Sequence, residues 1–412
     1  MKKLIAVIFL ALMLFSWCFI GKDSRKKPNS TVSSNSTSGM LSSQKNLTES
    51  KDAPKKSNET VSNSPSNTSL FTVEQNELNE TLYYGRNSLV GNEKSAYLDI
   101  VANIKTLTTN IDVAKYNLTI KQAKKIIYYI QADYPQLYWS YSNISYISSE
   151  YIKSLSFEYP FTKEEIIKNS KKISLTTTKL LYGISKSMTD YEKVKTIHDN
   201  LIKFAEYKSS PNDQYILGIL LDGYGVCASY AKTFQYLCYK VGIQSLYVIG
   251  SSINSSGKSV EHAWNIVKMD NDFYYLDVTW DDPLFNKKDA SYVSHKFFAI
   301  TTKQIKKTHS FSGDNYPLPS CTSTKCNYFV NEHLLFEDYN LACSNSIAEK
   351  MKKISSDGGK SIEVMFSNKP AFDACLANLS FNTNFKKAYA YVSGNKNDIF
   401  YSATYPYYEI FW

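Results

Sequence analysis

The sequence predicts an α+β fold, because helical and strand patterns of different period follow one another along the chain. Residues 227–241 repeat apolar side chains every three or four positions, which is typical of a helix with one buried face. Residues 262–267 and 273–279 are rich in β-branched and aromatic side chains, and the polar stretch between them predicts a hairpin. After residue 327, strand and helix patterns alternate in short segments, which predicts a small α/β module.

The helix predicted over 227–241 begins with a cysteine. Unpaired N–H groups and the positive end of the helix dipole favour thiolate over thiol in a first turn, so Cys227 has the environment of a reactive cysteine. Gly223 and Gly225 let the chain turn sharply ahead of it and let a substrate approach the backbone closely. Cys238 lies on the apolar stripe of the same helix, where we expect an unreactive structural thiol.

The hairpin brings a histidine and a carboxylate to one face if its turn has two residues. With the turn at 270–271, Trp264 pairs with Asp277 and His262 pairs with Thr279. His262 and Asp277 are then diagonal neighbours about 7–8 Å apart, which is within side-chain reach. A three-residue turn would put them on opposite faces, so the arrangement depends on this register.

Cys227, His262 and Asp277 are the residue types of a thiol acyl-transfer site. His262 would take the thiol proton and return it to the leaving group, while Asp277 would hold the imidazole tautomer. The backbone N–H of Cys227 is the expected oxyanion donor, and the sequence places no second donor. Asp281 and Asp282 are rival carboxylates, but they follow the predicted end of the strand, so Asp277 is favoured.

The histidines outside this set predict no second site. His198 and Asp199 are neighbours in a predicted helix, where adjacent side chains point about 100° apart, so a structural role is favoured. His295, His309 and His333 have no spacing typical of metal ligands, either with each other or with cysteines. We therefore expect no metal and no cofactor.

Three segments around the candidate residues resemble the transglutaminase-like superfamily. They are GYGVCASYAK at 223–232, HAWN at 262–265 and LDVTWDDP at 276–283. The resemblance covers roughly residues 190–309 and is closest to secreted bacterial members with a Cys-His-Asp triad. It implies a papain-like α+β core of helices and an antiparallel sheet, a covalent thioester intermediate and no required metal at the triad. Members of this family act as proteases, cross-linkers or amidases, and some have lost catalysis.

The beginning of the chain predicts export. Two lysines precede a 17-residue apolar run within residues 1–21, which is typical of a signal peptide or a short membrane anchor. Cys18 could be lipidated as in bacterial lipoproteins, although Trp17 replaces the small residue expected before such a cysteine. Residues 22–90 begin with a long stretch rich in Ser, Asn, Thr and Lys, and we expect them to form a disordered tether.

Three further regions are expected beyond the tether: a helical region over 91–189, the catalytic core over 190–326 and the α/β module over 327–412. The module carries no catalytic constellation and is expected to recognise a partner, to pack on the core, or both. Its strands are predicted at 333–336, 361–366, 387–392 and 399–405, and its helices at 345–354 and 370–379.

The spacing of two cysteines leaves open whether they form a disulfide. Cys321 and Cys326 could close a small loop disulfide in an oxidising compartment, although two free thiols are favoured. A single pair with this spacing is too little for a zinc site.

Charge excludes nucleic acid as the expected partner. The formal net charge is +9, but residues 2–3 and the surplus of four basic groups in residues 22–70 account for six of these charges. The remaining +3 is spread over residues 71–412, without a basic run punctuated by aromatic residues.

Together these features predict an exported, surface-tethered or secreted cysteine acyl-transfer enzyme of the cell envelope. Its expected substrates are peptide or side-chain amides of a protein, a peptide or the cell wall, and hydrolysis as a protease or amidase is favoured over cross-linking. The alternative is a catalytically silent binding module of the envelope that keeps the fold for recognition.

Overall fold

The structure is a computed structural model that describes most of the chain beyond the predicted export segment. The predictions for residues 1–21 and for most of the tether concern residues outside the described part of the chain. Within the described part, no helix has the length and apolar character needed to cross a membrane. The described residues are 80–412 without 149, 254–256, 283–291, 312–315, 379–381 and 395–399.

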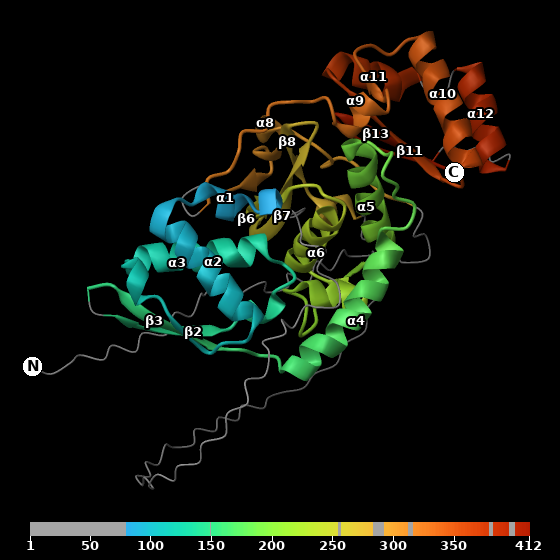
Figure 1. Cartoon of the computed structure of the whole chain (residues 1–412). Coiled ribbons are helices and arrows are strands. Elements are labelled where there is room, and N and C mark those ends of the chain that lie inside the picture. Colours follow the sequence, from blue (N-terminus) through green and yellow to red (C-terminus); the bar gives the residue numbers. More distant parts are fainter. Residues whose placement is uncertain are drawn as a thin grey trace, which may run out of the picture. The chain divides into compact units, whose positions relative to one another are not determined.

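The region before the core contains helices and a sheet, so the prediction of a helical region over 91–189 is incomplete. The sheet has strand order β1-β3-β2 and is antiparallel throughout. Strand β3 buries the side chains of Ile152, Leu155 and Phe157. A strand that buries one face and pairs with a neighbour on each side is typical of an antiparallel sheet. Figure 1 shows the helices α2 and α3 beside β2 and β3. The elements are α1 (Tyr84–Ser88), α2 (Gly91–Lys105), β1 (Asn110–Asp112), α3 (Ile120–Asp133), β2 (Asn143–Ser148), β3 (Ile152–Glu158) and α4 (Lys163–Leu180).

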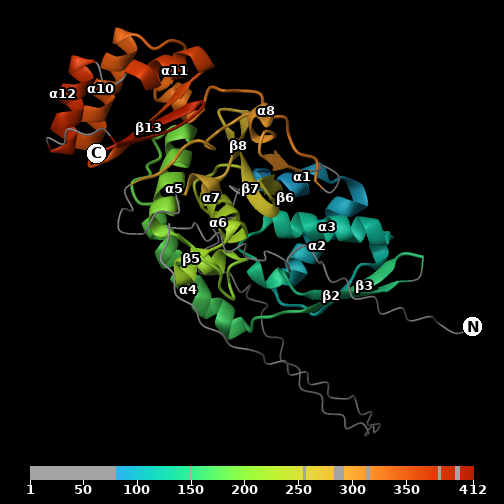
Figure 2. The same cartoon turned by 180° about the vertical axis from the view of Figure 1, so that it is seen from behind.

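The core consists of helices packed on a four-stranded antiparallel sheet with strand order β8-β7-β6-β9. The long helices α5 and α6 contact each other, and α6 packs against β6 and β7. Both views show α5 and α6 side by side (Figures 1 and 2). The elements are α5 (Asp190–Phe204), β4 (Glu206–Tyr207), a π-helix (Gly218–Asp222), β5 (Tyr224–Gly225), α6 (Cys227–Lys240), β6 (Ser245–Ile253), β7 (Ser259–Met269), β8 (Asp272–Leu276), α7 (Val278–Asp281), α8 (Thr302–Ile305) and β9 (His309–Ser310).

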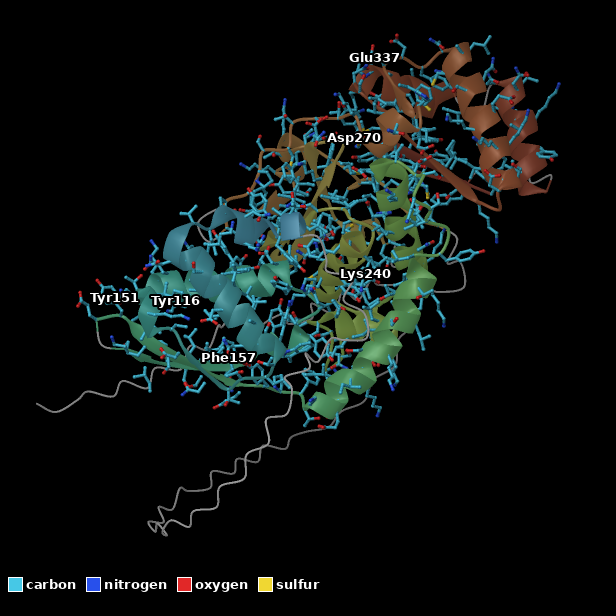
Figure 3. The ribbon with its side chains drawn as sticks, viewed as in Figure 1. Tyr116, Tyr151, Phe157, Lys240, Asp270 and Glu337 are labelled. Carbon is cyan, nitrogen blue, oxygen red and sulfur yellow. The ribbon has the colours of Figure 1, made fainter. Side chains whose placement is uncertain are left out.

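The hairpin between β7 and β8 has the predicted two-residue turn. Met269 pairs with Asp272 and Asn265 pairs with Leu276, which is the predicted register. Asp270 and Asn271 at the turn have φ values of 49° and 71°, as a type I′ turn requires. Figure 3 labels Asp270 at this turn.

The second strand of the hairpin ends earlier than predicted. It stops at Leu276, and Asp277 is the N-cap of α7 instead of a strand residue. The Asp277 side chain accepts hydrogen bonds from the backbone N–H groups of Thr279 and Trp280. An aspartate that can cap a helix in this way competes with continuation of a strand, so residues 278–281 turn into a short helix.

Two buried amides fix α6 on the sheet. Asn265 on β7 donates to the backbone oxygens of Ala231 and Leu246, at 3.0 and 3.2 Å. Gln235 on α6 donates to the backbone oxygens of Ala132 and Ser245, at 2.8 and 3.0 Å. These contacts hold the helix that begins with the candidate nucleophile against both the core sheet and α3.

The C-terminal module has a four-stranded sheet with strand order β10-β11-β13-β12. The strand predicted at 387–392 is wrong, because these residues lie in a helix. Phe385, Ala388 and Tyr389 are buried at helical spacing, and Asn382 caps the helix by accepting from the Phe385 N–H. The elements are α9 (Tyr328–Asn331), β10 (Leu335–Phe336), α10 (Leu341–Ser356), β11 (Ser361–Phe366), α11 (Lys369–Asn378), α12 (Thr383–Ser393), β12 (Phe400–Thr404) and β13 (Tyr407–Phe411).

None of the six described cysteines is in a disulfide, and all six are buried. Cys321 and Cys326 therefore form no disulfide in this structure. The Cys321 thiol is 3.7 Å from the Pro319 backbone oxygen, and the Cys326 thiol is 3.8 Å from Asp270 Oδ2.

A glycine on β6 allows the short strand β9 to approach the sheet. A Cβ atom at Gly250 would lie 2.2 Å from the Ser310 backbone oxygen and 2.7 Å from the Trp264 ring. Both distances are far below van der Waals contact, and the nearer atom belongs to the backbone. The position of β9, and of His309 on it, therefore depends on the absence of a side chain at residue 250.

Gly250→Ala should lower the free energy of unfolding by about 1–3 kcal/mol, because overpacking a tight contact forces the backbone to move. Urea denaturation of the two proteins measures this difference. Ser251→Ala is the matched control on the same strand and should have a much smaller effect. Equal stabilities of wild type and Gly250→Ala would show that β9 adapts without cost.

Candidate active site

Cys227 is the first residue of α6 and is only 2% exposed. The chain reaches it through Gly223, which has a φ of 79°, so this glycine provides the predicted sharp turn. Gly225 has a different role from the one predicted. A Cβ atom there would lie 2.5 Å from Ser229 Cβ, so Gly225 makes room for the first turn of α6 itself.

The side chain of Cys227 faces the sheet. It forms a small buried cluster with Ala231, Tyr247 and Ala263. Ala263 follows His262 on β7, and β7 is one of the strands on which α6 packs. The first turn of α6 therefore lies against the part of the sheet that carries the candidate base.

His262 and Asp277 are in direct contact. His262 Nε2 is 2.7 Å from Asp277 Oδ2, and both side chains are almost fully buried. Because the carboxylate engages Nε2, the imidazole offers Nδ1 to a thiol. The other carboxylate oxygen, Oδ1, accepts from the N–H groups of Thr279 and Trp280, which fixes the orientation of the carboxylate.

The two rival carboxylates have other partners. Asp281 Oδ2 is 3.2 Å from His198 Nε2. Asp282 Oδ2 accepts a hydrogen bond from the Tyr230 hydroxyl at 2.6 Å. The structure therefore pairs Asp277 with His262, as the register predicts, and assigns both rivals to separate contacts.

His309 is a member of this cluster that the sequence analysis missed. Its Nε2 is 3.0 Å from the same Asp277 Oδ2, and its Nδ1 is 2.8 Å from the Thr308 hydroxyl. The rings of Trp264 and Trp280 lie 4.7 Å from the His309 ring. Spacing along the chain could not reveal this contact, because β9 reaches the sheet by pairing with β6.

Two histidines keep the Asp277 carboxyl ionised. Burial alone would raise its pKa, but His262 and then His309 outweigh that effect and hold the pKa well below its usual range. Asp277 therefore remains an anion through the neutral range, where it can stabilise a positive charge that develops on His262.

A second cluster of buried polar side chains includes Asp281 of α7. It consists of His198, Asp199, Asp281, His295 and Glu363, and we call it the core network. Asp199 Oδ1 is 2.9 Å from His198 Nδ1 and 3.0 Å from His295 Nε2. The adjacent side chains of His198 and Asp199 therefore contact each other within a buried polar network.

In each imidazole of the core network, the ring nitrogen that does not contact Asp199 contacts another carboxylate. His295 Nδ1 is 3.2 Å from Glu363 Oε2, and His198 Nε2 contacts Asp281. Glu363 lies on β11, so the core network joins the C-terminal module to the core. The prediction that His295 and His309 have no site assignment is therefore incomplete, since His295 is buried between two carboxylates and the buried His309 contacts Asp277.

Two groups of donors are compact enough to surround one metal ion among the described residues. They are His262, Asp277 and His309, and His198, Asp199 and His295, with ligand atoms within 4.8 Å of one another in each group. Imidazole and carboxylate donors suit zinc. In both groups the candidate ligand atoms already contact one another at hydrogen-bond distance, because the two imidazoles share one carboxylate oxygen.

Residues 178–278 match the sequence profile described as the transglutaminase-like superfamily, and this span contains Cys227, His262 and Asp277. The protein therefore has a transglutaminase-like core within a mixed α+β fold, which confirms the predicted class. No curated protein matches the chain.

Two solved structures resemble part of the chain. A TGase is 16% identical, with 34% of this chain and 44% of that chain covered and a TM-score of 0.25. A proposed cysteine protease from Cytophaga hutchinsonii is 23% identical, with 27% of this chain and 37% of that chain covered and a TM-score of 0.23. The present chain thus spans less than half the length of either protein.

The core network should make stability depend on pH above neutrality. Burial lowers the pKa of His295, but Asp199 and Glu363 outweigh it and raise the pKa to about 9. A histidine whose pKa is raised on folding stabilises the protein fully below its ordinary pKa of about 6.5, and this contribution is lost as pH rises through about 9.

We therefore expect the free energy of unfolding of wild type to exceed that of His295→Gln by on the order of 1–3 kcal/mol at pH 6.5, and by much less at pH 9.5. Urea denaturation at both pH values tests this. His333→Gln, which changes an exposed histidine, is the matched control. A difference between wild type and His295→Gln that stays constant from pH 6.5 to 9.5 would contradict the assignment of a charged His295.

Proposed function

We propose that this protein is an exported cysteine acyl-transfer enzyme that hydrolyses peptide or side-chain amides through a thioester intermediate. One observation carries the proposal. A cysteine in the first turn of a buried helix lies against the strand that carries His262, and the Nε2 atom of this histidine is held by an ionised carboxylate. The transglutaminase-like core supports the same class of chemistry.

The chemistry begins with transfer of the Cys227 thiol proton to His262 Nδ1. The thiolate attacks the amide carbonyl carbon and forms an S–C bond, while the backbone N–H of Cys227 donates to the oxyanion. His262 then returns the proton to the departing nitrogen as the C–N bond breaks, which leaves a thioester on Cys227. Asp277 stabilises the imidazolium in both steps.

Water completes the cycle. His262 accepts a proton from the water molecule, and the resulting hydroxide attacks the thioester carbonyl. The C–S bond then breaks to release a carboxylic acid, and His262 returns its proton to the Cys227 sulfur. An amine in place of water would give a cross-link by the same sequence of steps. The proposal favours hydrolysis, with a protein, a peptide or a cell-wall peptide as the substrate.

The reactivity of the two cysteines on α6 tests the proposal. Iodoacetamide at pH 6 should alkylate Cys227 at least about tenfold faster than Cys238, because thiolate is the reactive species. Burial raises the pKa of Cys238 well above its usual range, so Cys238 serves as the internal control. Mass spectrometry of the digested protein follows both sites.

His262→Ala should slow the alkylation of Cys227 and leave that of Cys238 unchanged, since the imidazole stabilises the thiolate. Cys227→Ala should abolish labelling by an activity-based thiol probe. Equal and slow alkylation of Cys227 and Cys238 in wild type would mean that Cys227 is an ordinary thiol. That result would favour a catalytically silent binding module of the cell envelope.

The proposed location has its own test. The apolar run within residues 1–21 would span about 26 Å as a helix, which suits a signal peptide or a short anchor. The fifty or so polar residues that follow would reach roughly 40 Å as a flexible coil, enough to hold the enzyme away from the bilayer.

Protease added to intact cells should therefore cut within residues 22–90 and release an active fragment that contains Cys227. Immunoblotting and thiol-probe labelling of the released fraction measure both properties. A cytosolic protein of similar size is the control for cell lysis. Full-length chain that stays in the cytosol and resists the external protease would contradict the proposed location.

A further inference from the structure

A lysine is buried inside α6, close to the candidate nucleophile. Lys232 is 1% exposed, although lysine is almost never fully buried unless its charge is compensated. Its Nζ donates to the backbone oxygen of Gln214 at 2.8 Å. A carbonyl oxygen stabilises an ammonium ion only in part, so other groups around Lys232 must contribute if it is to stay charged.

Three tyrosine rings surround the Lys232 ammonium group. Its Nζ lies 4.0 Å from the ring centroid of Tyr141, 5.2 Å from that of Tyr247 and 5.7 Å from that of Tyr215. Cation–π attraction is strongest when the cation is desolvated, as it is here. The rings come from separate parts of the chain, so the fold assembles a cage that holds a positive charge in a fixed place.

The cage and the nucleophile share Tyr247. This ring belongs to the buried cluster that contains Cys227, Ala231 and Ala263, and it also contacts the Lys232 ammonium group. Burial lowers the pKa of Lys232 to about 7, and the charge of Cys227 acts in the opposite direction. Each group therefore favours the ionised form of the other, in a dry environment that strengthens the attraction.

We propose that Lys232 is a positioning residue whose caged ammonium group favours the thiolate form of Cys227 before substrate binds. This inference rests on the proposed function and adds a cation that acts from within α6 itself. A helix N-terminus and an adjacent cation are both known ways to lower the pKa of a cysteine, and α6 then combines them at one thiol.

The other titratable groups near Cys227 restrict the interpretation of a pH profile. Burial raises the pKa of Tyr141 and of Tyr215, so both rings ionise less readily than an ordinary tyrosine. His262 on β7 and Lys232 on α6 are the two basic side chains of the candidate site. Variants at these two positions therefore separate the two contributions.

The test is the rate of iodoacetamide alkylation of Cys227 between pH 5 and pH 10 in the full chain. Iodoacetamide is uncharged, so removal of a cation does not change its attraction to the site. In Lys232→Met the inflection of the profile should move up by about one pH unit, which makes alkylation at pH 6 about tenfold slower. The rate at high pH, where the thiol is fully ionised in both proteins, should stay close to that of wild type.

Lys240→Met is the matched control. Lys240 lies at the end of the same helix (Figure 3), and its ammonium group lies over the Tyr236 ring at 5.3 Å. Lys240→Met removes a lysine and a cation–π contact at the opposite end of α6 from Cys227. The pH profile of Cys227 alkylation should therefore keep the wild-type inflection. Slow alkylation of Cys238 in every variant verifies that α6 is still folded.

A reciprocal measurement avoids the risk that Lys232→Met does not fold. NMR of protein with ¹³C-labelled lysine follows the titration of Lys232, and the inflection should be lower in Cys227→Ala than in wild type, because coupling between two sites is mutual. Identical lysine titrations in the two proteins, or an unmoved cysteine inflection in a folded Lys232→Met, would overturn the role of Lys232. An ordinary thiol inflection near 8.5 in wild type would instead overturn the proposed function itself.

Discussion

The buried carboxylate of Asp277 is the constraint on which the candidate site depends. A charge without solvent must be matched by hydrogen bonds, and Asp277 has four: two from imidazole nitrogens and two from backbone N–H groups. To supply them, β7 must present His262, β9 must present His309 and the chain after β8 must turn into α7. The register of the hairpin, the end of β8 and the approach of β9 are therefore parts of one arrangement.

Local sequence patterns were sufficient for the parts of the site that are close together along the chain. The apolar repeat after Cys227 and the turn at 270–271 predict the helix start and the strand register. The pairing of His262 with Asp277 follows from that register. The predicted strand at β8 was too long, because β-rich composition favoured a strand whereas the side chain of Asp277 caps a helix.

Contacts between distant segments were not predictable in this way. His309 reaches Asp277 from a two-residue strand whose position depends on the space beside Gly250. His295 is 96 residues from Asp199 and 68 from Glu363, and no periodicity connects such positions. In the C-terminal module, residues 387–392 resemble a strand by composition, but one buried face at helical spacing makes residues 383–393 a helix.

The short helix α7 links the two polar clusters, since Asp277 caps its beginning and Asp281 lies at its end. From Asp281 the contacts continue through His198, Asp199 and His295 to Glu363 on the C-terminal sheet. The change of sequence pattern after residue 326 therefore marks no boundary between separate units, because the described residues from 80 to 412 belong to one compact unit. The C-terminal module supplies an acceptor that the interior of the core requires. A chain truncated before β11 would leave His295 Nδ1 without its Glu363 acceptor inside the core.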